Sequence, residues 1–227
     1  MSRPIQRIAE VAEDQWGVVT RQQAEQAGVP WPTLSRLTKD GLLQRVDRGV
    51  YRIRGADPPD HLSLRAAWLQ LDPAVPAWRR LDDPEVAVVS HTSAAALYGV
   101  GDLRPDIQEF TLPVRRQSRR KDIRLHRGTF GDADVLILHG LPATRAGRMI
   151  GDLLADHVDP VATAQIVNQV LTHVYDHPST VAERLAPFAA RFGLNPGDGI
   201  GALDYMLRLA GSRERELLVT EAKGLGR

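Results

Sequence analysis

Residues 28–53 read GVPWPTLSRLTKDGLLQRVDRGVYRI, and this stretch decides the fold of the first part of the chain. Pro30 and Pro32 suit the first turn of a helix, where the backbone N–H groups have no helical partners. Gly41 is typical of the residue that follows a helix. Two strand-like runs then flank residues 47–49, where a glycine supplies the positive φ of a tight hairpin. The stretch therefore predicts a helix followed by a β-hairpin.

Two shorter helical patterns precede this stretch. Apolar residues recur at helical spacing over residues 5–16, and Gly17 ends that helix. Thr20 is suited to cap a second short helix over residues 21–27. Three helices followed by a hairpin is the order of elements in a winged helix-turn-helix, so we expect this DNA-binding fold over residues 1–55.

The predicted third helix and the hairpin carry the candidate DNA contacts. In a helix-turn-helix the second helix of the motif enters the major groove. Leu34 and Leu37 lie three residues apart and should face the core, which leaves hydroxyl and basic side chains free to reach bases and phosphates. The predicted interface consists of Thr33, Ser35, Arg36, Lys39, Arg45, Arg48 and Arg52.

The distribution of charge along the chain favours DNA binding, whereas the net charge of the whole chain does not. The whole chain of 227 residues has a formal net charge of +1, which argues neither for nor against nucleic acid. Residues 1–55 contain nine basic and six acidic residues, and the acidic ones concentrate in the first helix. We expect this helix to face away from DNA. A winged helix that binds protein instead of DNA is the alternative.

The remainder of the chain predicts a second domain of mixed type. A linker is expected at residues 56–61, followed by alternating helical and strand-like patterns over residues 62–210, with helices at the end. Residues 211–227 are expected to form a charged tail. The chain is thus predicted to be α+β, with an N-terminal winged helix-turn-helix and a mixed α/β C-terminal domain ending in helices.

A run of basic residues is the strongest local signal in the second domain. Seven basic residues and one acidic residue fall within residues 115–127. Such a run can bind phosphates, RNA or an acidic partner, and it can equally be a solvated loop between two strands. The basic residues of this run are Arg115, Arg116, Arg119, Arg120, Lys121, Arg124 and Arg127.

Nothing in the sequence points to a catalytic residue or a cofactor. The chain has no cysteine, and its histidines have spacings that match no metal-binding motif. Glu221-Ala222-Lys223 resembles half of a nuclease motif, but no suitably placed Asp precedes it. No apolar run reaches the ~18 residues that span a bilayer. We therefore expect a cytoplasmic, non-enzymatic protein without metal, cofactor or membrane contact, and a nuclease remains a further alternative.

Several short motifs resemble those of the AbiEi-type antitoxins of type IV toxin–antitoxin systems. In the first part these are GVVTRQQA at residues 17–24, LSRL at residues 34–37 and RGVY at residues 48–51. In the second part they are SHTSAA at residues 90–95 and LPAT at residues 141–144, the latter followed by Arg148 and Asp152. The similarity extends over residues 5–175, and it is the combination of both parts that resembles this family.

The resemblance implies an antitoxin from a bacterial toxin–antitoxin operon. Antitoxins of this family use the winged helix to bind inverted repeats in their own promoter and repress transcription, and their second domain counteracts a nucleotidyltransferase-like toxin. Double-stranded DNA and such a toxin are the implied partners, and direct contact with the toxin is left open. A stand-alone winged-helix transcription factor with a ligand-sensing C-terminal domain is the alternative.

Overall fold

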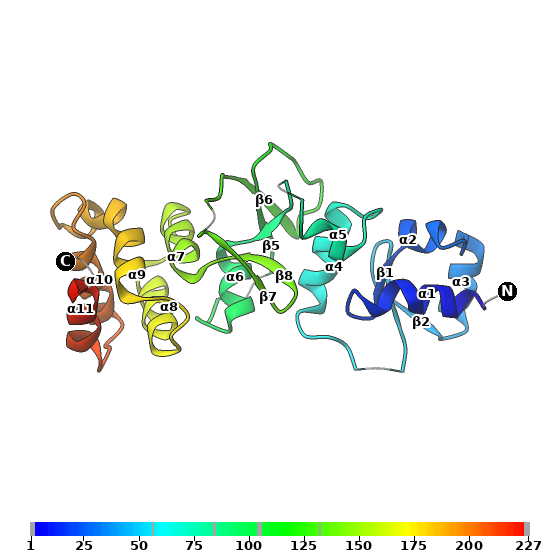
Figure 1. Ribbon diagram of the computed structural model, residues 1–227, viewed down its shortest axis with the longest axis horizontal. Helices are drawn as coiled ribbons and strands as arrows, with labels where there is room; N and C mark the ends of the chain where they lie inside the picture. Colours follow the sequence, from blue (N-terminus) through cyan, green and yellow to red (C-terminus); the bar gives the residue numbers. More distant parts are fainter. Residues whose placement is uncertain (1–2, 56, 84, 104–105, 132, 225–227) are drawn as a thin grey trace. The chain divides into compact units, whose positions relative to one another are not determined.

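The structure is a computed structural model that divides into two compact units, Met1–Ala87 and Val88–Arg227 (Figure 1). The first unit holds a small antiparallel sheet with helices, and the second holds a mixed sheet followed by helices, so the chain is α+β as predicted. The residues that the structure describes are 3–55, 57–83, 85–103, 106–131 and 133–224.

The first unit begins with helices and strands in winged helix-turn-helix order. Its three strands form an antiparallel sheet in the order β1-β3-β2. The sequence pattern did not predict β1, because its three residues are all buried and show no alternation of apolar and polar positions. The elements are α1 (Pro4–Glu13), β1 (Val18–Thr20), α2 (Arg21–Gln26), α3 (Trp31–Lys39), β2 (Leu43–Asp47) and β3 (Val50–Ile53).

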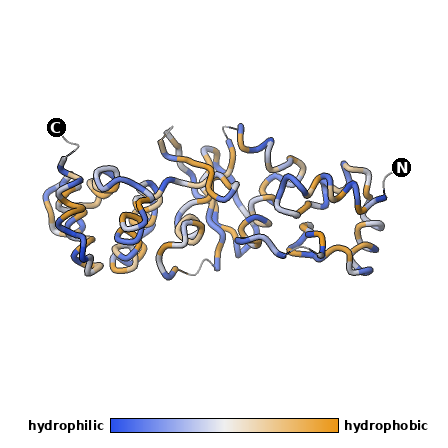
Figure 2. The backbone as a smooth tube through the Cα atoms, turned by 60° about the horizontal axis from the view of Figure 1, so that its bottom comes forward, coloured by the Kyte–Doolittle hydropathy of each residue, from blue (hydrophilic) through white to orange (hydrophobic). Residues whose placement is uncertain are grey.

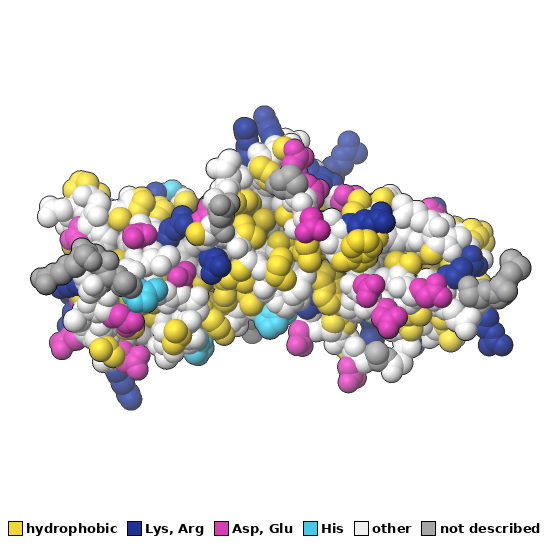
Figure 3. Space-filling model, viewed as in Figure 1, with side chains coloured by type: hydrophobic (Ala, Val, Ile, Leu, Met, Phe, Trp, Pro, Cys, Tyr) yellow, Lys and Arg dark blue, Asp and Glu magenta, His cyan; other side chains and the backbone are white. Residues whose placement is uncertain are grey.

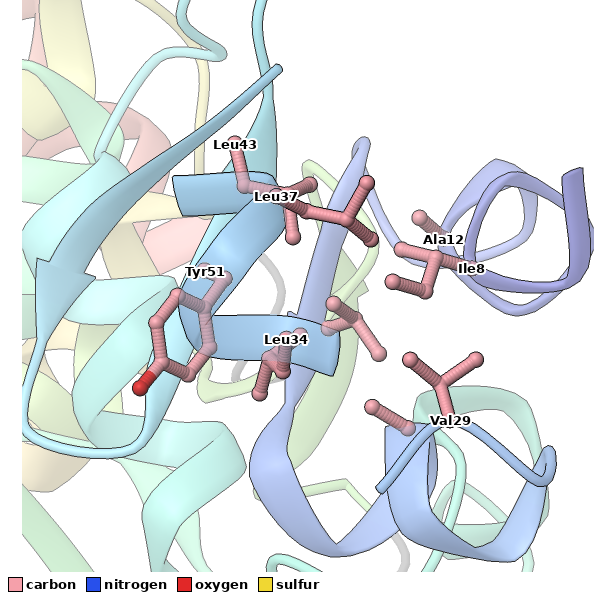
Figure 4. Close-up of a cluster of buried hydrophobic side chains, with 9 residues drawn as sticks. Ile8, Ala12, Val29, Leu34, Leu37, Leu43 and Tyr51 are labelled. Carbon is pink, nitrogen blue, oxygen red and sulfur yellow. The ribbon is translucent and has the colours of Figure 1, made fainter. Parts of the chain in front are cut away.

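A hydrophobic core holds α1, α3 and the β2–β3 hairpin together. Ile8 of α1 and Leu34 of α3 are fully buried, and Leu43 and Tyr51 join them from the hairpin. Figure 4 shows side chains of this cluster gathered between these elements, together with Val29 from the segment before α3. Burying a side chain of the size of leucine stabilises the fold by about 1.5–3 kcal/mol. The core therefore fixes which face of α3 points outward.

The turn of the hairpin depends on Gly49, as predicted. Its φ is 73°, in the left-handed region that glycine adopts without strain. The carboxylate of Asp47 accepts from the N–H of Arg48 at 2.6 Å within the turn. The N–H of Arg21 donates to the carbonyl of Gly49 at 2.8 Å, which attaches the tip of the hairpin to the start of α2.

Two further helices, α4 (Leu62–Leu71) and α5 (Ala77–Arg80), belong to the first unit, although we expected α4 to begin the second domain. Seven of the ten residues of α4 are buried, so this helix needs packing partners on most of its sides. The Arg65 guanidinium lies 4.4 Å from the ring centroid of Trp16, and the rings of Trp16 and Trp68 meet at 6.1 Å. These contacts pack α4 against the winged helix.

A buried pair of amides attaches the segment between α4 and α5 to the winged helix. Gln15 Nε2 donates to Gln23 Oε1 at 2.6 Å, and Gln23 Nε2 donates to the carbonyl of Val75 at 3.1 Å. Gln15 Oε1 accepts from the N–H of Ala77 at 3.2 Å, and Gln23 Oε1 accepts from the N–H of Thr20 at 3.0 Å. Because both amides are buried, they must find their partners inside the protein.

The second unit contains a mixed sheet in the order β6-β5-β4-β8-β7. β5 and β6 run parallel, as do β4 and β8, and the other neighbours run antiparallel. The sequence pattern did not predict β8, because Pro142 within a short run argues against a strand. The strands are β4 (Val88–Val89), β5 (Gln108–Leu112), β6 (Ile123–Arg127), β7 (Val135–Leu138) and β8 (Leu141–Thr144).

Helices make up the rest of the second unit. Met149, Ile150 and Leu153 are buried on one face of α7, as in an amphipathic helix. In Figure 2 the later helices alternate between hydrophobic and hydrophilic residues along the tube. Among the described residues, no helix is long and apolar enough to cross a membrane. The helices are α6 (His91–Tyr98), α7 (Ala146–Ala155), α8 (Pro160–Thr172), α9 (Pro178–Leu185), the 3-10 helix η1 (Ala186–Phe192), α10 (Gly199–Leu209) and α11 (Arg215–Gly224).

The last helix replaces part of the charged tail that we expected over residues 211–227. Leu218, Val219 and Ala222 of α11 are buried, so the helix has a narrow apolar face. The charged residues around this face, among them Glu221 and Lys223, outnumber its apolar residues and hide the helical pattern in the sequence.

The motif residues Arg148 and Asp152 form part of an ion-pair network in the second unit. Arg148 Nε lies 2.8 Å from Asp152 Oδ1, and Arg148 Nη1 lies 3.1 Å from Asp134 Oδ2. Arg184 of α9 pairs with the same Asp134 carboxylate. These side chains join the segment before β7 to α7 and α9, so their role in the structure is to hold the sheet and the helices together.

We predict that Gln23→Leu lowers the free energy of unfolding by about 1–3 kcal/mol, because it removes the buried hydrogen bonds that Gln23 makes with Gln15, Thr20 and Val75. Gln22→Leu on the exposed side of the same helix is the matched control. Urea unfolding followed by circular dichroism measures both. Equal losses in the two variants would show that the amide pair does not stabilise the first unit.

Candidate nucleic-acid interface

The third helix presents a basic face to solvent. Leu34 and Leu37 are buried, as predicted. With 3.6 residues per turn, the side of α3 opposite to these leucines carries Ser35, Arg36 and Lys39. The side chains of Arg36 and Lys39 are exposed, and that of Ser35 is half-buried. Three of the four residues that we predicted on this helix therefore share one outward face.

The fourth residue, Thr33, lies at the border of this face. It is four residues before Leu37, so it flanks the buried side of the helix, and it is half-buried itself. The Thr38 hydroxyl donates to the carbonyl of Leu34 at 2.9 Å, within the helix. The exposed basic pair, rather than the threonines, is therefore the chemically prominent feature of α3.

The hairpin separates the three arginines that we predicted on it. Arg45 is paired across the sheet with Tyr51, and Gln44 is paired with Arg52. Because successive residues of a strand point to opposite faces, Arg45 and Arg52 lie on opposite faces of the hairpin. Arg52 Nε donates to Gln44 Oε1 at 2.7 Å. Arg48 is exposed at the turn.

A basic and aromatic cavity of about 410 Å³ lies beside the turn of the hairpin. Arg45 and Arg48 line it together with Arg21 of α2, Trp31 at the start of α3, and Tyr51. The Arg21 guanidinium lies 4.9 Å from the ring centroid of Trp31. Burial raises the pKa of the Tyr51 hydroxyl, against the opposing charges of Arg45 and Arg21, so the phenol stays protonated.

Sequence reasoning missed Arg21 and Trp31 as members of this interface. Trp31 is 42% exposed, and a large exposed aromatic residue beside cations is typical of a binding surface. The helical period gave no signal for Trp31, because it lies three residues before Leu34, the spacing that also separates Leu34 from Leu37. Arg21 lies on a different helix and reaches the cavity only in the folded chain.

The predicted basic run of the second domain lies mostly in the loop at residues 113–122, which connects the parallel strands β5 and β6. Figure 3 shows Lys and Arg side chains projecting at the top of the view over this loop. Two members are held by carboxylates, Arg120 by Asp122 and Arg124 by Glu109 and Asp156. The exposed members are Arg115, Arg116, Arg119, Lys121, Arg124 and Arg127.

A cluster of polar side chains, which we call the Glu109 cluster, surrounds the buried carboxylate of Glu109 on β5. Thr92 at the start of α6 donates its backbone N–H to Glu109 Oε2 at 3.0 Å, and its hydroxyl donates to the same oxygen. His126 Nε2 lies 3.2 Å from Glu109 Oε1, and Arg124 Nη1 lies 3.4 Å from it. His91 and His126 stack with their ring centroids 3.6 Å apart. The carboxylate therefore accepts hydrogen bonds at both of its oxygens.

The Glu109 carboxylate is ionised at neutral pH. Burial raises its pKa, but the hydrogen bonds from His126 and from the hydroxyl and N–H of Thr92 outweigh this effect and lower the pKa to about 2. Burial and the neighbouring imidazole of His126 lower the pKa of His91 against the attraction of nearby carboxylates, so His91 is mostly neutral at pH 7. The cluster thus contains a buried negative charge.

The nuclease alternative finds no support in the geometry around Glu221. This residue lies on a helix, α11, and its carboxylate is 3.3 Å from His177 Nε2. In the described part of the chain, the groups of His, Asp and Glu that could share a metal ion do not include Glu221.

The order of elements and of strands in residues 4–53 is that of a winged helix-turn-helix. Residues 6–54 match the model of a family described as a transcriptional regulator, AbiEi antitoxin. The resemblance stated for this part of the chain is confirmed, and it remains a prediction for residues 55–175. A comparison of the whole chain with curated proteins gave no match. The matched family combines transcription regulation with an antitoxin role.

We predict that Glu109 contributes to stability at neutral pH and loses this contribution in acid. Its pKa falls from the ordinary 4.5 to about 2 in the folded chain, so the contribution is present above pH 4.5 and disappears as the pH falls toward 2. The difference between the two pKa values corresponds to about 3 kcal/mol.

The measurement compares the free energies of unfolding of the wild type and Glu109→Gln between pH 7 and pH 2. The gap between the two proteins should narrow as the pH falls, because the wild-type carboxyl group becomes neutral like the amide. Glu183→Gln, at an exposed position, serves as the control. A gap that stays constant across this range would contradict an ionised Glu109 in the folded state.

Proposed function

We propose that the chain is the antitoxin of a bacterial toxin–antitoxin pair and represses its own promoter through the winged helix. The single observation that carries the proposal is the family match over residues 6–54, which coincides with the module that presents Arg36 and Lys39 outward. In this proposal α3 enters the major groove at each half of an inverted repeat, and Ser35, Arg36 and Lys39 face the base edges.

The hairpin contributes phosphate contacts in this proposal. Arg45 and Arg48 line the same cavity as Arg21 and Trp31, so a DNA phosphate near the start of α3 would meet three guanidinium groups. Arginine binds phosphate through two parallel hydrogen bonds, which positions the protein without reading sequence. Arg52 points to the other face of the hairpin, and we assign it a smaller part in binding.

The second unit carries the antitoxin activity in this proposal, and it opposes a nucleotidyltransferase-like toxin. The exposed members of the basic run support this role, because a loop of arginines attracts a phosphate-rich or acidic surface. Transcription regulation and antitoxin activity then belong to different parts of one chain, and each can be tested without the other.

We predict that Arg36→Ala weakens binding to the chain's own promoter by about 1–3 kcal/mol and relaxes the preference for promoter over scrambled DNA. Fluorescence anisotropy with both DNAs measures this, and Arg208→Ala on α10 is the control for the loss of one positive charge. If Arg36→Ala binds the promoter as tightly as Arg208→Ala does, α3 does not read the bases through Arg36.

The hairpin variants extend the same experiment. Arg48→Ala should weaken binding to both DNAs equally and reduce the slope of log affinity against log salt by about 1. Arg45→Ala should have a larger effect than Arg52→Ala, because the two side chains lie on opposite faces. A change in sequence preference in Arg48→Ala would show that the hairpin reads bases.

We predict that neutralising the basic loop abolishes antitoxin activity but leaves promoter binding intact. The variant replaces the exposed basic residues of the loop by alanine, namely Arg115, Arg116, Arg119 and Lys121. The assay is rescue of cells that express the nucleotidyltransferase-like toxin that the proposal expects beside this chain, with Arg208→Ala/Arg213→Ala as the control. Lost promoter affinity with intact rescue would instead assign the loop to DNA binding.

A further inference from the structure

The Glu109 cluster brings together three metal-ligating side chains from different elements. Glu109 of β5, His126 of β6 and Asp156 directly after α7 each offer an atom, and these atoms lie within 4.8 Å of one another. The cluster is accessible, because Glu109 and Asp156 line a cavity of about 220 Å³ with Thr92 and Arg124. The sequence could not predict this arrangement, since the ligands are separated by 17 and 30 residues and follow no spacing motif.

The hydrogen bonds around Glu109 prepare one of its oxygens for a cation. Oε2 is occupied by the N–H and hydroxyl of Thr92, whereas Oε1 lies 3.2 Å from His126 Nε2 and 3.4 Å from the exposed Arg124 side chain. Outer hydrogen bonds of this kind fix the orientation of metal ligands in proteins. Stacking on His91 likewise fixes the ring of His126, whose Nε2 points toward the same oxygen. Two of the three ligands are therefore held in place before anything binds.

A replaceable cation already lies between the carboxylates. Arg124 Nη1 is 3.4 Å from Glu109 Oε1 and 3.2 Å from Asp156 Oδ2. Both distances exceed the 2.7–2.9 Å that is typical of strong charge-assisted hydrogen bonds. The Arg124 side chain is 52% exposed, so it can turn into solvent with little loss. The position of the guanidinium shows that a positive charge is favourable between the Glu109 and Asp156 carboxylates, and its long contacts show that it binds them weakly.

We propose that Glu109, His126 and Asp156 bind a divalent transition-metal ion, with Zn²⁺ as the preferred ion, and that Arg124 competes with it. One imidazole and two carboxylates form a ligand set that suits Zn²⁺, with water at the fourth position. Imidazole disfavours Mg²⁺ and Ca²⁺, which prefer oxygen ligands. Two carboxylates disfavour an anion at the same place.

The experiment titrates Zn²⁺ into the full chain, purified without a histidine tag and treated with EDTA, and follows binding by calorimetry. We expect one Zn²⁺ per chain in the wild type. Glu109→Gln, His126→Gln and Asp156→Asn should each bind at least about tenfold more weakly, and Thr92→Val about 10–100-fold more weakly through loss of an outer hydrogen bond. His173→Gln, an exposed histidine outside the cluster, is the matched control.

Arg124→Ala provides the decisive comparison, because removal of the competing charge should tighten Zn²⁺ binding by about tenfold. If Arg124→Ala binds Zn²⁺ more weakly, or if the cluster variants bind it as the His173→Gln control does, the proposal is overturned. No binding to either the wild type or Arg124→Ala also overturns it. Asp156→Asn keeps the test informative if Glu109→Gln fails to fold, because Asp156 is 40% exposed at the end of a helix.

Discussion

The burial of Leu34 and Leu37 is the constraint on which the basic face of α3 depends. These two leucines fit the core of the first unit in one rotation of α3 only, so they determine that Arg36 and Lys39 point outward. The proline-rich start of α3 sets the beginning of the helix, and the core sets its rotation. The basic face is thus a consequence of packing, and a substitution in the core would move every candidate contact on the helix together.

Contacts with α4, α5 and the segment between them, which follow the winged helix in the sequence, stabilise it. The buried amides of Gln15 and Gln23 attach the segment between α4 and α5 to α2, and α4 packs its arginine and tryptophan on Trp16. Because a buried amide without a partner is costly, this contact stabilises one arrangement of α4 and α5 against the winged helix. The folded module therefore includes residues up to Ala87, beyond the stretch that matches the family.

The parts of the fold that the sequence predicted are those with local causes. The helical period around Leu34 and Leu37 and the turn at Gly49 depend on residues within a few positions of one another. The strands β1 and β8 and the helix α11 escaped prediction, because burial on both sides, a proline, or surrounding charge obscured their patterns. The candidate DNA contacts also differ in how far the sequence predicts them. The outward face of α3 follows from the helical period, whereas the cavity with Arg21 and Trp31 forms only in the assembled fold.

The Glu109 cluster in the second unit likewise requires the assembled fold. Histidine spacing alone therefore could not predict the proposed metal site. His126 and Arg124 share a face of β6 because they are two residues apart, and Glu109 reaches them because β5 is paired in parallel with β6. That pairing depends on the basic loop at residues 113–122, which makes the crossover between the two strands. The same loop thus contributes to two separate features. Its own side chains form a basic surface, and its connection of β5 to β6 allows the strand pairing that places the buried Glu109 carboxylate beside the His126 imidazole.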